Sequence, residues 1–336
     1  MKAVQIDRYS KEIRTVLREV PLPDVGPSDV LVRVEAAAVN PVDLLVLSGS
    51  VRLIQDYPMP LTLGNECSGV VEAVGGEVAG FRPGEKVYAR LPVAKIGAFA
   101  EYVVVDQDAL SPMPEGYGFD KAAAIPLTGL TAWQGITEEL QAEPGKTLLI
   151  TGGSGSFGQI AVPLAKALGL HVIVTGNERA RERLMALGAD RYLDYRKEDY
   201  WEILSGMDYV IDALGADEFE KELSVLKPGG KLLSLRAAPN KAFAVSKGFG
   251  FAKRTLFAVA GMKYDRAAKK QGKEYRFIFV RSDGAQLREI TRIVERERIV
   301  PKTDPRTFTL ETARDALELV KAGRIQGKVI INPRSK

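Results

Sequence analysis

The sequence predicts an α/β protein in which a doubly wound domain with a parallel sheet is inserted into a second, mostly β domain. Three observations predict this fold. Short strands and turns fill the residues before Ala122, strands and helices alternate after it, and a glycine-rich turn joins an apolar strand at 147–151 to a helix. The chain of 336 residues is long enough for two domains of ordinary size.

The N-terminal region is predicted to form a small, irregular β-barrel. Residues 30–36 alternate apolar with polar side chains, which is typical of a half-buried strand. Three further strands are expected at 69–76, 81–88 and 98–105, with glycine or Pro-Gly turns between several of them.

The composition argues against several classes of protein. The net charge of +4 is mild and spread along the chain, which gives no support for nucleic-acid binding. With one cysteine, Cys67, and one histidine, His171, no intrachain disulfide, thiolate zinc cluster or multi-histidine site is expected. No apolar run is long enough for a membrane span, and the start lacks the apolar stretch of a signal peptide. We therefore expect a cytoplasmic protein with neither a nucleic-acid nor a membrane partner.

The glycine turn after strand 147–151 is the strongest local signal. Gly153, Gly155 and Gly158 fit G-x-G-x-x-G, while Gly152, Gly155 and Gly158 equally fit the wider G-x-x-G-x-x-G. Such a turn lets the backbone approach a pyrophosphate and directs the free N–H groups of a helix N-terminus at it. Glycine turns also occur for packing alone, so the motif by itself leaves both interpretations open.

The end of the next strand, 171–175, indicates which dinucleotide is bound. NAD sites usually place an acid there for the ribose 2′-hydroxyl, whereas this chain has Gly176 and Asn177, which leave room for a 2′-phosphate. Arg179 and Arg181 could supply charge-assisted hydrogen bonds to that phosphate. The alternative for each arginine is a solvated helix face. We expect NADPH rather than NADH.

Four segments carry a resemblance to a known superfamily. Residues 40–43 (Asn-Pro-Val-Asp), 64–71 (Gly-Asn-Glu-Cys-Ser-Gly-Val-Val) and 97–102 (Gly-Ala-Phe-Ala-Glu-Tyr) resemble the GroES-like domain of the medium-chain dehydrogenase/reductases, and 122–132 resembles their crossover helix. The resemblance covers essentially the whole chain. It implies a GroES-like catalytic domain at 1–122, a Rossmann NADP-binding domain at 123–283 and a C-terminal return to the catalytic domain at 284–336.

The branch of the superfamily is indicated by two asparagines. Zinc alcohol dehydrogenases carry a Cys where this chain has Asn40 and a His where it has Asn65, and asparagine is not an ordinary zinc ligand. Cys67 is interpreted as a small buried residue rather than a catalytic one. The chain therefore resembles the zinc-free quinone oxidoreductase branch, which also holds alkenal and enoyl reductases, and no metal site is expected.

The motifs and the resemblance together give a set of expected cofactor contacts. The resemblance adds Tyr195 near the 2′-phosphate, the loop after the fourth strand and two cations of the last segment; Ala180 stands where NADPH-binding members often carry a lysine. The expected contacts are Asn40, Thr131, Gly152, Ser154, Gly155, Ser156, Phe157, Gly158, Gly176, Asn177, Arg179, Arg181, Tyr195, Leu214, Gly215, Arg324 and Lys328.

The expected activity is an NADPH-dependent reduction of quinones or α,β-unsaturated carbonyl compounds without zinc. Asn40 and Asp43 are the candidate catalytic side chains, and the proton donor is left open between Tyr57 and solvent. Two alternatives are a zinc-free ketone or aldehyde reductase and a non-enzymatic NADPH-binding scaffold or redox sensor. The resemblance also implies a homodimer.

A long segment between the fifth and sixth expected strands, 237–275, has no assigned role. It mixes aromatic residues with many lysines and arginines. A substrate lid, a dimer element or a solvated cover with a basic face are all compatible with this composition.

Overall fold

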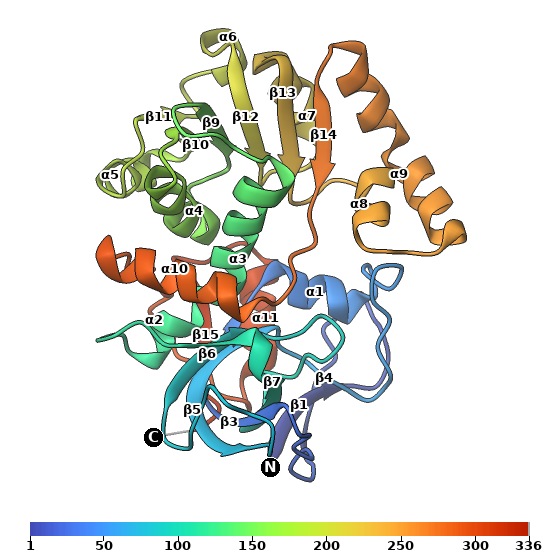
Figure 1. Cartoon of the computed structure of the whole chain (residues 1–336), viewed down its shortest axis with the longest axis vertical. Helices are drawn as coiled ribbons and strands as arrows, with labels where there is room; N and C mark the ends of the chain where they lie inside the picture. Colours follow the sequence, from blue (N-terminus) through green and yellow to red (C-terminus); the bar gives the residue numbers. More distant parts are fainter. Residues whose placement is uncertain (335–336) are drawn as a thin grey trace. The chain divides into compact units, whose positions relative to one another are not determined.

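The computed structural model describes residues 1–334, which form two compact units (Figure 1). Unit 1 consists of Met1–Leu130 and the segment from Arg281 onward, and unit 2 consists of Thr131–Val280. The helix α3 (Pro126–Gln134) runs from unit 1 into unit 2. The divisions therefore follow Leu130 and Val280, whereas the sequence placed them after 122 and 283.

Unit 1 is built on antiparallel strands, as the alternating segments predicted. Its larger sheet has the order β15-β3-β5-β6-β8, with β7 also paired to β3, and a three-stranded sheet has the order β2-β1-β4. The strands are β1 (Lys2–Ile6), β2 (Val16–Glu19), β3 (Asp29–Val39), β4 (Leu61–Thr62), β5 (Glu66–Val74), β6 (Lys86–Arg90), β7 (Tyr102–Asp106), β8 (Leu110–Pro112) and β15 (Val329–Ile331). In β3, Val32 and Val34 are buried while Arg33 and Glu35 are half-buried, so the predicted alternation is present.

Strand β15, at one end of this strand order, contributes to the core of unit 1. β15 pairs antiparallel with β3, placing Ile330 opposite Ala38. Helix α2 contributes Ala123 to the same buried cluster, in which Ile330 and Ala38 also lie. The helices of this unit outside α3 are α1 (Pro41–Ser48), α2 (Phe119–Ala123), α10 (Gly284–Arg296) and α11 (Ala313–Lys321).

Unit 2 is a doubly wound α/β domain, which confirms the predicted fold class. Its six strands are all parallel and have the order β11-β10-β9-β12-β13-β14. The chain adds strands on one side of β9 up to β11 and then on the other side from β12 onward, so the strand order reverses between β9 and β12. The strands are β9 (Thr147–Thr151), β10 (His171–Gly176), β11 (Arg191–Asp194), β12 (Met207–Asp212), β13 (Leu226–Ser234) and β14 (Glu274–Phe277). β9 is apolar and buried over Leu148–Ile150 because helices cover both faces of such a sheet.

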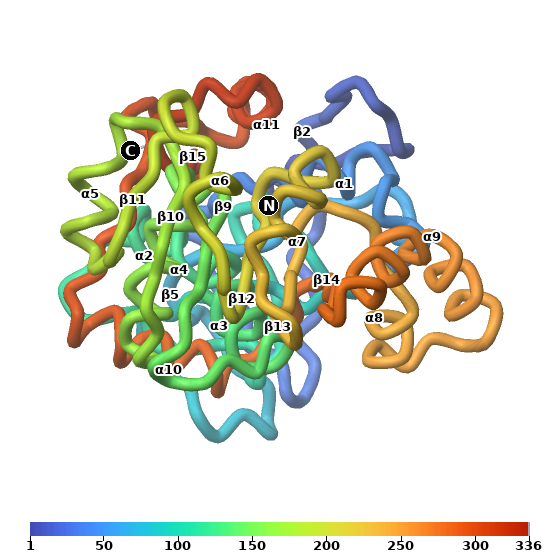
Figure 2. The backbone as a smooth tube through the Cα atoms, turned by 90° about the horizontal axis from the view of Figure 1, so that it is seen from above, coloured from blue at the N-terminus to red at the C-terminus, as the bar shows by residue number. Residues whose placement is uncertain are grey.

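Six helices accompany this sheet. They are α4 (Ser156–Ala167), α5 (Arg181–Ala186), α6 (Tyr200–Ile203), α7 (Phe219–Val225), α8 (Lys241–Ser246) and α9 (Phe251–Lys270). Within unit 2, α8 and α9 lie past β14, at the opposite end of the sheet from β11 (Figure 2). Among residues 1–334, no helix combines the length and the apolar character that crossing a bilayer requires.

Candidate functional site

The glycine turn connects β9 to α4 as predicted, and Gly152, Gly155 and Gly158 have different surroundings in it. Gly152 adopts φ 64°, a left-handed conformation that favours glycine. A Cβ on Gly158 would lie 1.9 Å from the carbonyl oxygen of Gly153, so helix and turn pack too closely for a side chain. Gly155, by contrast, has nothing within 4 Å of an added Cβ. Packing therefore requires Gly158, whereas Gly155 faces open space at the start of α4.

The end of β10 is closed to any side chain. A Cβ on Gly176 would lie 2.2 Å from the Tyr192 hydroxyl, which donates a hydrogen bond to the Asn177 carbonyl (2.6 Å). Thr175 ties this strand to the glycine turn, because its Oγ1 accepts the Gly152 N–H (3.2 Å). Of the two positions assigned to the acid of NAD sites, 176 is thus held as glycine by Tyr192, and 177 carries the neutral Asn177.

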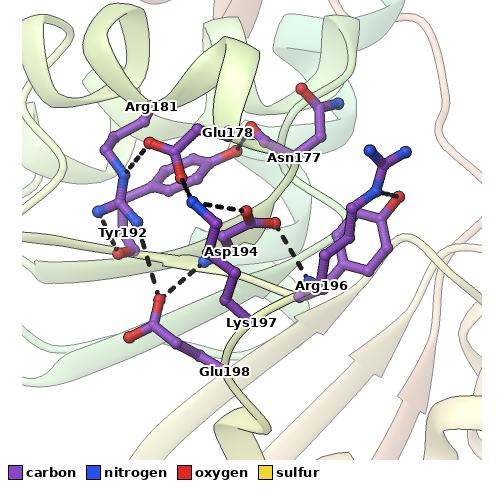
Figure 3. A network of polar contacts seen from close by, with 9 residues as sticks. Asn177, Glu178, Arg181, Tyr192, Asp194, Arg196, Lys197 and Glu198 are labelled. Atoms are coloured by element: carbon purple, nitrogen blue, oxygen red, sulfur yellow. Dashed lines mark hydrogen bonds and ion pairs between the residues drawn. The ribbon is translucent and has the colours of Figure 1, made fainter.

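The two predicted phosphate-binding arginines have different surroundings. Arg181 is held within its own unit: its Nε donates to Glu178 (2.8 Å), an Nη donates to the Tyr192 carbonyl (2.9 Å), and Glu198 lies 3.7 Å away (Figure 3). Arg179 is exposed. The Arg181 guanidinium already has three acceptors, namely Glu178, the Tyr192 carbonyl and Glu198. It therefore links the ends of β10 and β11 and is less suited to bind an added anion.

A third arginine at this edge was not singled out from the sequence. Arg196 lies beside Tyr195, with its Nε 3.3 Å from the Tyr195 hydroxyl and its guanidinium 5.6 Å from the ring centroid (Figure 3). Both side chains are exposed, Tyr195 by 54%. Among the described residues, no acidic side chain forms an ion pair with Arg196, so its charge is available. Tyr195 was expected near the 2′-phosphate, and the arginine that directly follows it was the signal that could have pointed to Arg196.

The loop after β12 is held by a buried carboxylate. The N–H groups of Leu214 and Gly215 both donate to Asp212 Oδ1 at 2.7 Å, and Ser234 Oγ donates to Asp212 Oδ2 at 2.5 Å. Gly215 adopts φ 110°, which favours glycine. The ends of β12 and β13 are therefore joined through Asp212, and this linkage fixes the two predicted contact residues Leu214 and Gly215.

A second buried acid stands beside Asp212. Glu222 of α7 is fully buried and accepts a hydrogen bond from Thr151 Oγ1 (2.6 Å), at the end of β9. Burial, reinforced by the charge of Asp212, raises the pKa of Glu222 to about 9. Glu222 is therefore protonated at neutral pH. The sequence analysis did not identify this pair, since Glu222 follows a helix start where an acid is usually solvated.

Unit 1 contains a second buried polar cluster, around Asn40. The Asn40 N–H donates to Asp43 Oδ2 (2.7 Å), and Asp43 Oδ1 accepts from Asn65 Nδ2 (2.7 Å). The Asn40 amide nitrogen donates to Glu66 Oε1 (2.7 Å) and to the Ala38 carbonyl (3.2 Å). The two predicted catalytic residues, Asn40 and Asp43, are thus brought together at the start of α1, and Asp43 orients both asparagines.

Lys328 neutralises this cluster. Its ammonium group is 2.9 Å from Glu66 Oε1, donates to Thr128 Oγ1 (3.1 Å) and donates to Asn40 Oδ1, and the residue is 3% exposed. An ammonium group has three N–H donors, so these partners use all of them. Lys328 was predicted to contact cofactor phosphate, and in this arrangement it has no donor left for one. Arg324, predicted for the same role, is exposed.

Burial perturbs three titratable side chains of unit 1 strongly. Burial raises the pKa of Asp43 to about 7 and that of the Cys67 thiol to about 12. Burial also raises the pKa of Tyr57 to about 12. The Tyr57 hydroxyl donates a hydrogen bond to the Val93 carbonyl (2.7 Å). Cys67 is buried, as its interpretation as a small core residue predicted. The fully buried Arg90, which donates to the Leu91 carbonyl, was not anticipated from the sequence.

The other predicted contacts divide between the units. Asn40, Asp43, Arg324 and Lys328 belong to unit 1, and the rest belong to unit 2. Ser154, Ser156 and Phe157 are half-buried at the glycine turn, and Thr131 is half-buried in α3. Within residues 1–334, no three or more His, Cys, Asp or Glu side chains are grouped so as to hold a metal ion.

Known proteins resemble this chain in sequence and in fold. Residues 26–115 match the family described as alcohol dehydrogenase GroES-like domain, and 187–331 match that described as zinc-binding dehydrogenase. The mitochondrial NAD(P)H oxidoreductase RTN4IP1 of Danio rerio is 30% identical over 99% of this chain and 91% of its own length. The chain belongs to the medium-chain dehydrogenase/reductases, in their quinone oxidoreductase branch.

Further relatives agree with this placement. The 2-methylene-furan-3-one reductase of Solanum lycopersicum is 30% identical, with 99% of this chain and 79% of that protein covered. The structure of the quinone oxidoreductase from Coxiella burnetii superposes with a TM-score of 0.83 at 27% identity and covers 99% of both chains. As a medium-chain dehydrogenase/reductase of this branch, the chain is an oxidoreductase, and the resemblance inferred from its motifs is confirmed.

Proposed function

We propose that this chain is an NADPH-dependent reductase that transfers hydride to quinones or α,β-unsaturated carbonyl compounds without zinc. The observation that carries the proposal is the end of β10. A side chain at position 176 would collide with Tyr192, so the acid that accepts the ribose 2′-hydroxyl of NAD has no room there. The relatives support the same activity, among them an NADPH-dependent alkenal/one oxidoreductase of Arabidopsis thaliana that is 28% identical.

We assign the 2′-phosphate to the exposed pair Tyr195 and Arg196, with Arg179 as a further cation. Arg196 has an exposed guanidinium and a stacked tyrosine that holds it in place. The pyrophosphate would lie at the open space beside Gly155, where N–H groups at the start of α4 are available. Arg181 then acts as a positioning residue for the strand edge.

Bound NADPH supplies the hydride, and the chain supplies orientation. Asn40 is buried and fixed on both sides of its amide by Glu66, Ala38 and Lys328, so the amide has one orientation and both of its N–H donors are in use. Asp43 holds the backbone of Asn40, which makes it a positioning residue. Asn40 and Asn65 replace the Cys and His of zinc members. A conjugated acceptor spreads the arriving negative charge over an enolate or quinol system and depends less on a Lewis acid than a simple ketone does.

The activity is tested by following NADPH and NADH oxidation with panels of quinones, enals, enoyl thioesters and simple ketones, with a chelator present. We expect NADPH to be consumed with quinones or enals and the chelator to have no effect. Faster reduction of simple ketones would favour a carbonyl reductase. Tight NADPH binding without turnover on any panel would favour a scaffold or sensor, and loss of activity with chelator would overturn the zinc-free assignment.

The phosphate assignment is tested by the NADPH affinity of the Arg196→Ala variant, measured by calorimetry. We expect NADPH to bind at least about tenfold more weakly and NADH to be unaffected, because the lost interaction is with the 2′-phosphate. Arg191→Ala removes an exposed arginine from β11 and is the matched control. Equal NADPH affinity in Arg196→Ala and the parent protein would remove Arg196 from the site.

We further propose a homodimer located in the cytoplasm. The homodimer is what the resemblance to the medium-chain dehydrogenase/reductases implies, since many members of that superfamily are homodimers. Light scattering on the purified protein is expected to give twice the chain mass, and a monomer would contradict the proposal. Cell fractionation tests the compartment.

A further inference from the structure

The charge of this protein is concentrated in one segment of unit 2. Residues 241–270, which contain α8 and α9, hold eight lysines or arginines and one acid, a net charge of +7. The whole chain carries +4, so all other residues together carry −3. The mild overall charge therefore conceals a strongly basic element, and the expectation of an evenly spread charge is wrong.

One face of α9 is packed against unit 2. Phe257 meets Phe243 edge-on at 5.9 Å, and Tyr264 stacks on Tyr275 of β14 at 5.0 Å. Gly261 lies so close to α8 that a Cβ would stand 2.4 Å from that of Asn240. Asp265, the acid of the segment, turns to this face and accepts from Asn240 Nδ2 (2.7 Å). The outer face of α9 consequently presents no carboxylate.

The outer face combines exposed apolar side chains with cations. Phe251 is 87% exposed and Val259 59%, and Leu256 and Val245 are each nearly half exposed. Positions 256, 259, 263 and 270 fall on one side of a helix, so the first half of this face is apolar and the second half basic. We name the α8–α9 surface as Val245, Phe251, Lys253, Arg254, Leu256, Val259, Lys263, Arg266, Lys269 and Lys270.

Several of these cations lie along apolar groups. The Lys253 ammonium group lies 4.9 Å from the ring centroid of Phe249. The Lys263 ammonium group lies 4.6 Å from the ring centroid of Tyr264. Long basic side chains in such positions keep their charge in water while their stems cover apolar surface. Exposed apolar side chains with cations beside them can contact apolar and anionic groups at the same time.

We propose that the α8–α9 surface docks on an anionic membrane surface, with Phe251, Leu256 and Val259 entering the headgroup region and the cations pairing with lipid phosphates. Charge complementarity decides the occupant. A second copy of the same surface would bring two segments of +7 together, which is unfavourable. A nucleic acid would satisfy the cations but offers no apolar region for Leu256 and Val259. The contact is peripheral, and it differs from the expectation of no membrane partner, which rested on the lack of a spanning segment.

The proposal is tested by flotation of the full-length protein with vesicles of phosphatidylcholine alone or mixed equally with phosphatidylglycerol. We expect binding to the anionic vesicles, at least tenfold weaker binding to the neutral ones, and loss of binding near 1 M salt, where charges are screened within about 3 Å. Absence of binding to anionic vesicles overturns the proposal.

Two double variants locate the contact. Phe251→Ser/Val259→Ser removes apolar groups and Lys263→Glu/Lys270→Glu reverses charges, and each is expected to weaken binding at least tenfold. The controls are Leu22→Ser, another exposed apolar residue, and Lys11→Glu/Lys321→Glu, which changes the net charge equally in unit 1. Binding that is unchanged in both test variants, or reduced equally by the controls, overturns the assignment to this surface.

Three further readouts complete the test. Phe251→Trp, at a position too exposed to disturb folding, is expected to shift its fluorescence to the blue on addition of anionic vesicles, and no shift would contradict insertion. A dimer that dissociates in Phe251→Ser/Val259→Ser, without vesicle binding by the parent protein, would make this face an interface between copies. Binding of a DNA duplex without vesicle binding would make the partner a nucleic acid. Either outcome overturns the membrane proposal.

Discussion

The two units each bury a pair of acids, but they deal with the charge differently. In unit 1, Asp43 and Glu66 are fully buried, and the ammonium group of Lys328 lies 2.9 Å from Glu66. In unit 2, Asp212 and Glu222 are as deeply buried, yet no Lys or Arg among the described residues forms an ion pair with either. There the charge is lowered by a proton, since the pKa of Glu222 rises to about 9.

This difference shows two ways to fix a loop with carboxylates. The cation of unit 1 keeps Glu66 available as an acceptor for Asn40 and for the Leu127 N–H (2.7 Å). The proton of unit 2 lets Asp212 remain the acceptor for Leu214, Gly215 and Ser234. The carboxylate Glu66 of unit 1 therefore depends on a distant lysine, whereas the acid pair of unit 2 depends on a proton that is held up to about pH 9.

The largest expected effect comes from removing the cation of unit 1. Lys328→Met would leave the buried Glu66 carboxylate with its hydrogen-bond donors but without a counter-charge, and we expect the free energy of unfolding to fall by about 3–5 kcal/mol. Urea denaturation measures this change. Lys321→Met removes an exposed lysine of α11 and should change stability by less than about 0.5 kcal/mol.

A second substitution tests whether the loss has this cause. Glu66→Gln added to Lys328→Met removes the uncompensated charge, so the double variant should be more stable than Lys328→Met alone. Additive losses in the double variant would show that the lysine stabilises unit 1 by packing rather than by charge.

The next effect distinguishes the two clusters by pH. Asp43 and Glu222 have folded pKa values raised to about 7 and about 9, above those of the unfolded chain. Each therefore contributes stability that is full below its unfolded pKa and is lost as pH rises through its folded pKa, by up to about 1.4 kcal/mol per pH unit. Of these two acids, only Glu222 makes the stability fall further between pH 7 and 9.

Glu222→Gln should consequently flatten the loss of stability between pH 7 and 9, measured by urea denaturation at several pH values. Asp43→Asn should flatten it only at lower pH, between about 4 and 7. If Glu222→Gln and the parent protein show the same slope above pH 7, Glu222 is not the group that holds the proton.

The smallest effect is expected from the hydroxyl that links β13 to Asp212. Ser234→Ala removes a hydrogen bond to a buried carboxylate and should lower stability by about 1–2 kcal/mol. Because Asp212 also holds the loop at Leu214, hydrogen exchange at Leu214 and Gly215 should become faster. Ser224→Ala, on an exposed part of α7, is the control, and equal exchange rates in both variants would separate Ser234 from the loop.

The sequence predicted features whose signal is local. The turn at Gly152–Gly158 and the glycine at the end of β10 could be recognised because strand, turn and helix follow each other directly. The antiparallel sheet of unit 1 was likewise visible as alternation in residues 30–36. Asn40 and Asp43 were singled out because residues 40–43 resemble a short motif of the superfamily.

What the sequence analysis missed depends on residues that are far apart. Lys328 and Asn40 are separated by 288 positions, and no periodicity links them. Glu222 stands in the first turn of a helix, where an acid is usually solvated, and only the end of β9 beneath it explains its burial. Arg181 looked available for phosphate because its partners Tyr192 and Glu198 lie on another strand and beyond it.

The position of Lys328 in the chain has a consequence for biosynthesis. Unit 2 is one continuous stretch, so its sheet can form while the C-terminal part is still being translated. Unit 1 receives both β15 and the partner of Glu66 from residues that follow unit 2 in the chain. A nascent chain that has not yet reached β15 therefore carries a complete unit 2 and an open unit 1, and unit 1 can close only when Lys328 and β15 have been made.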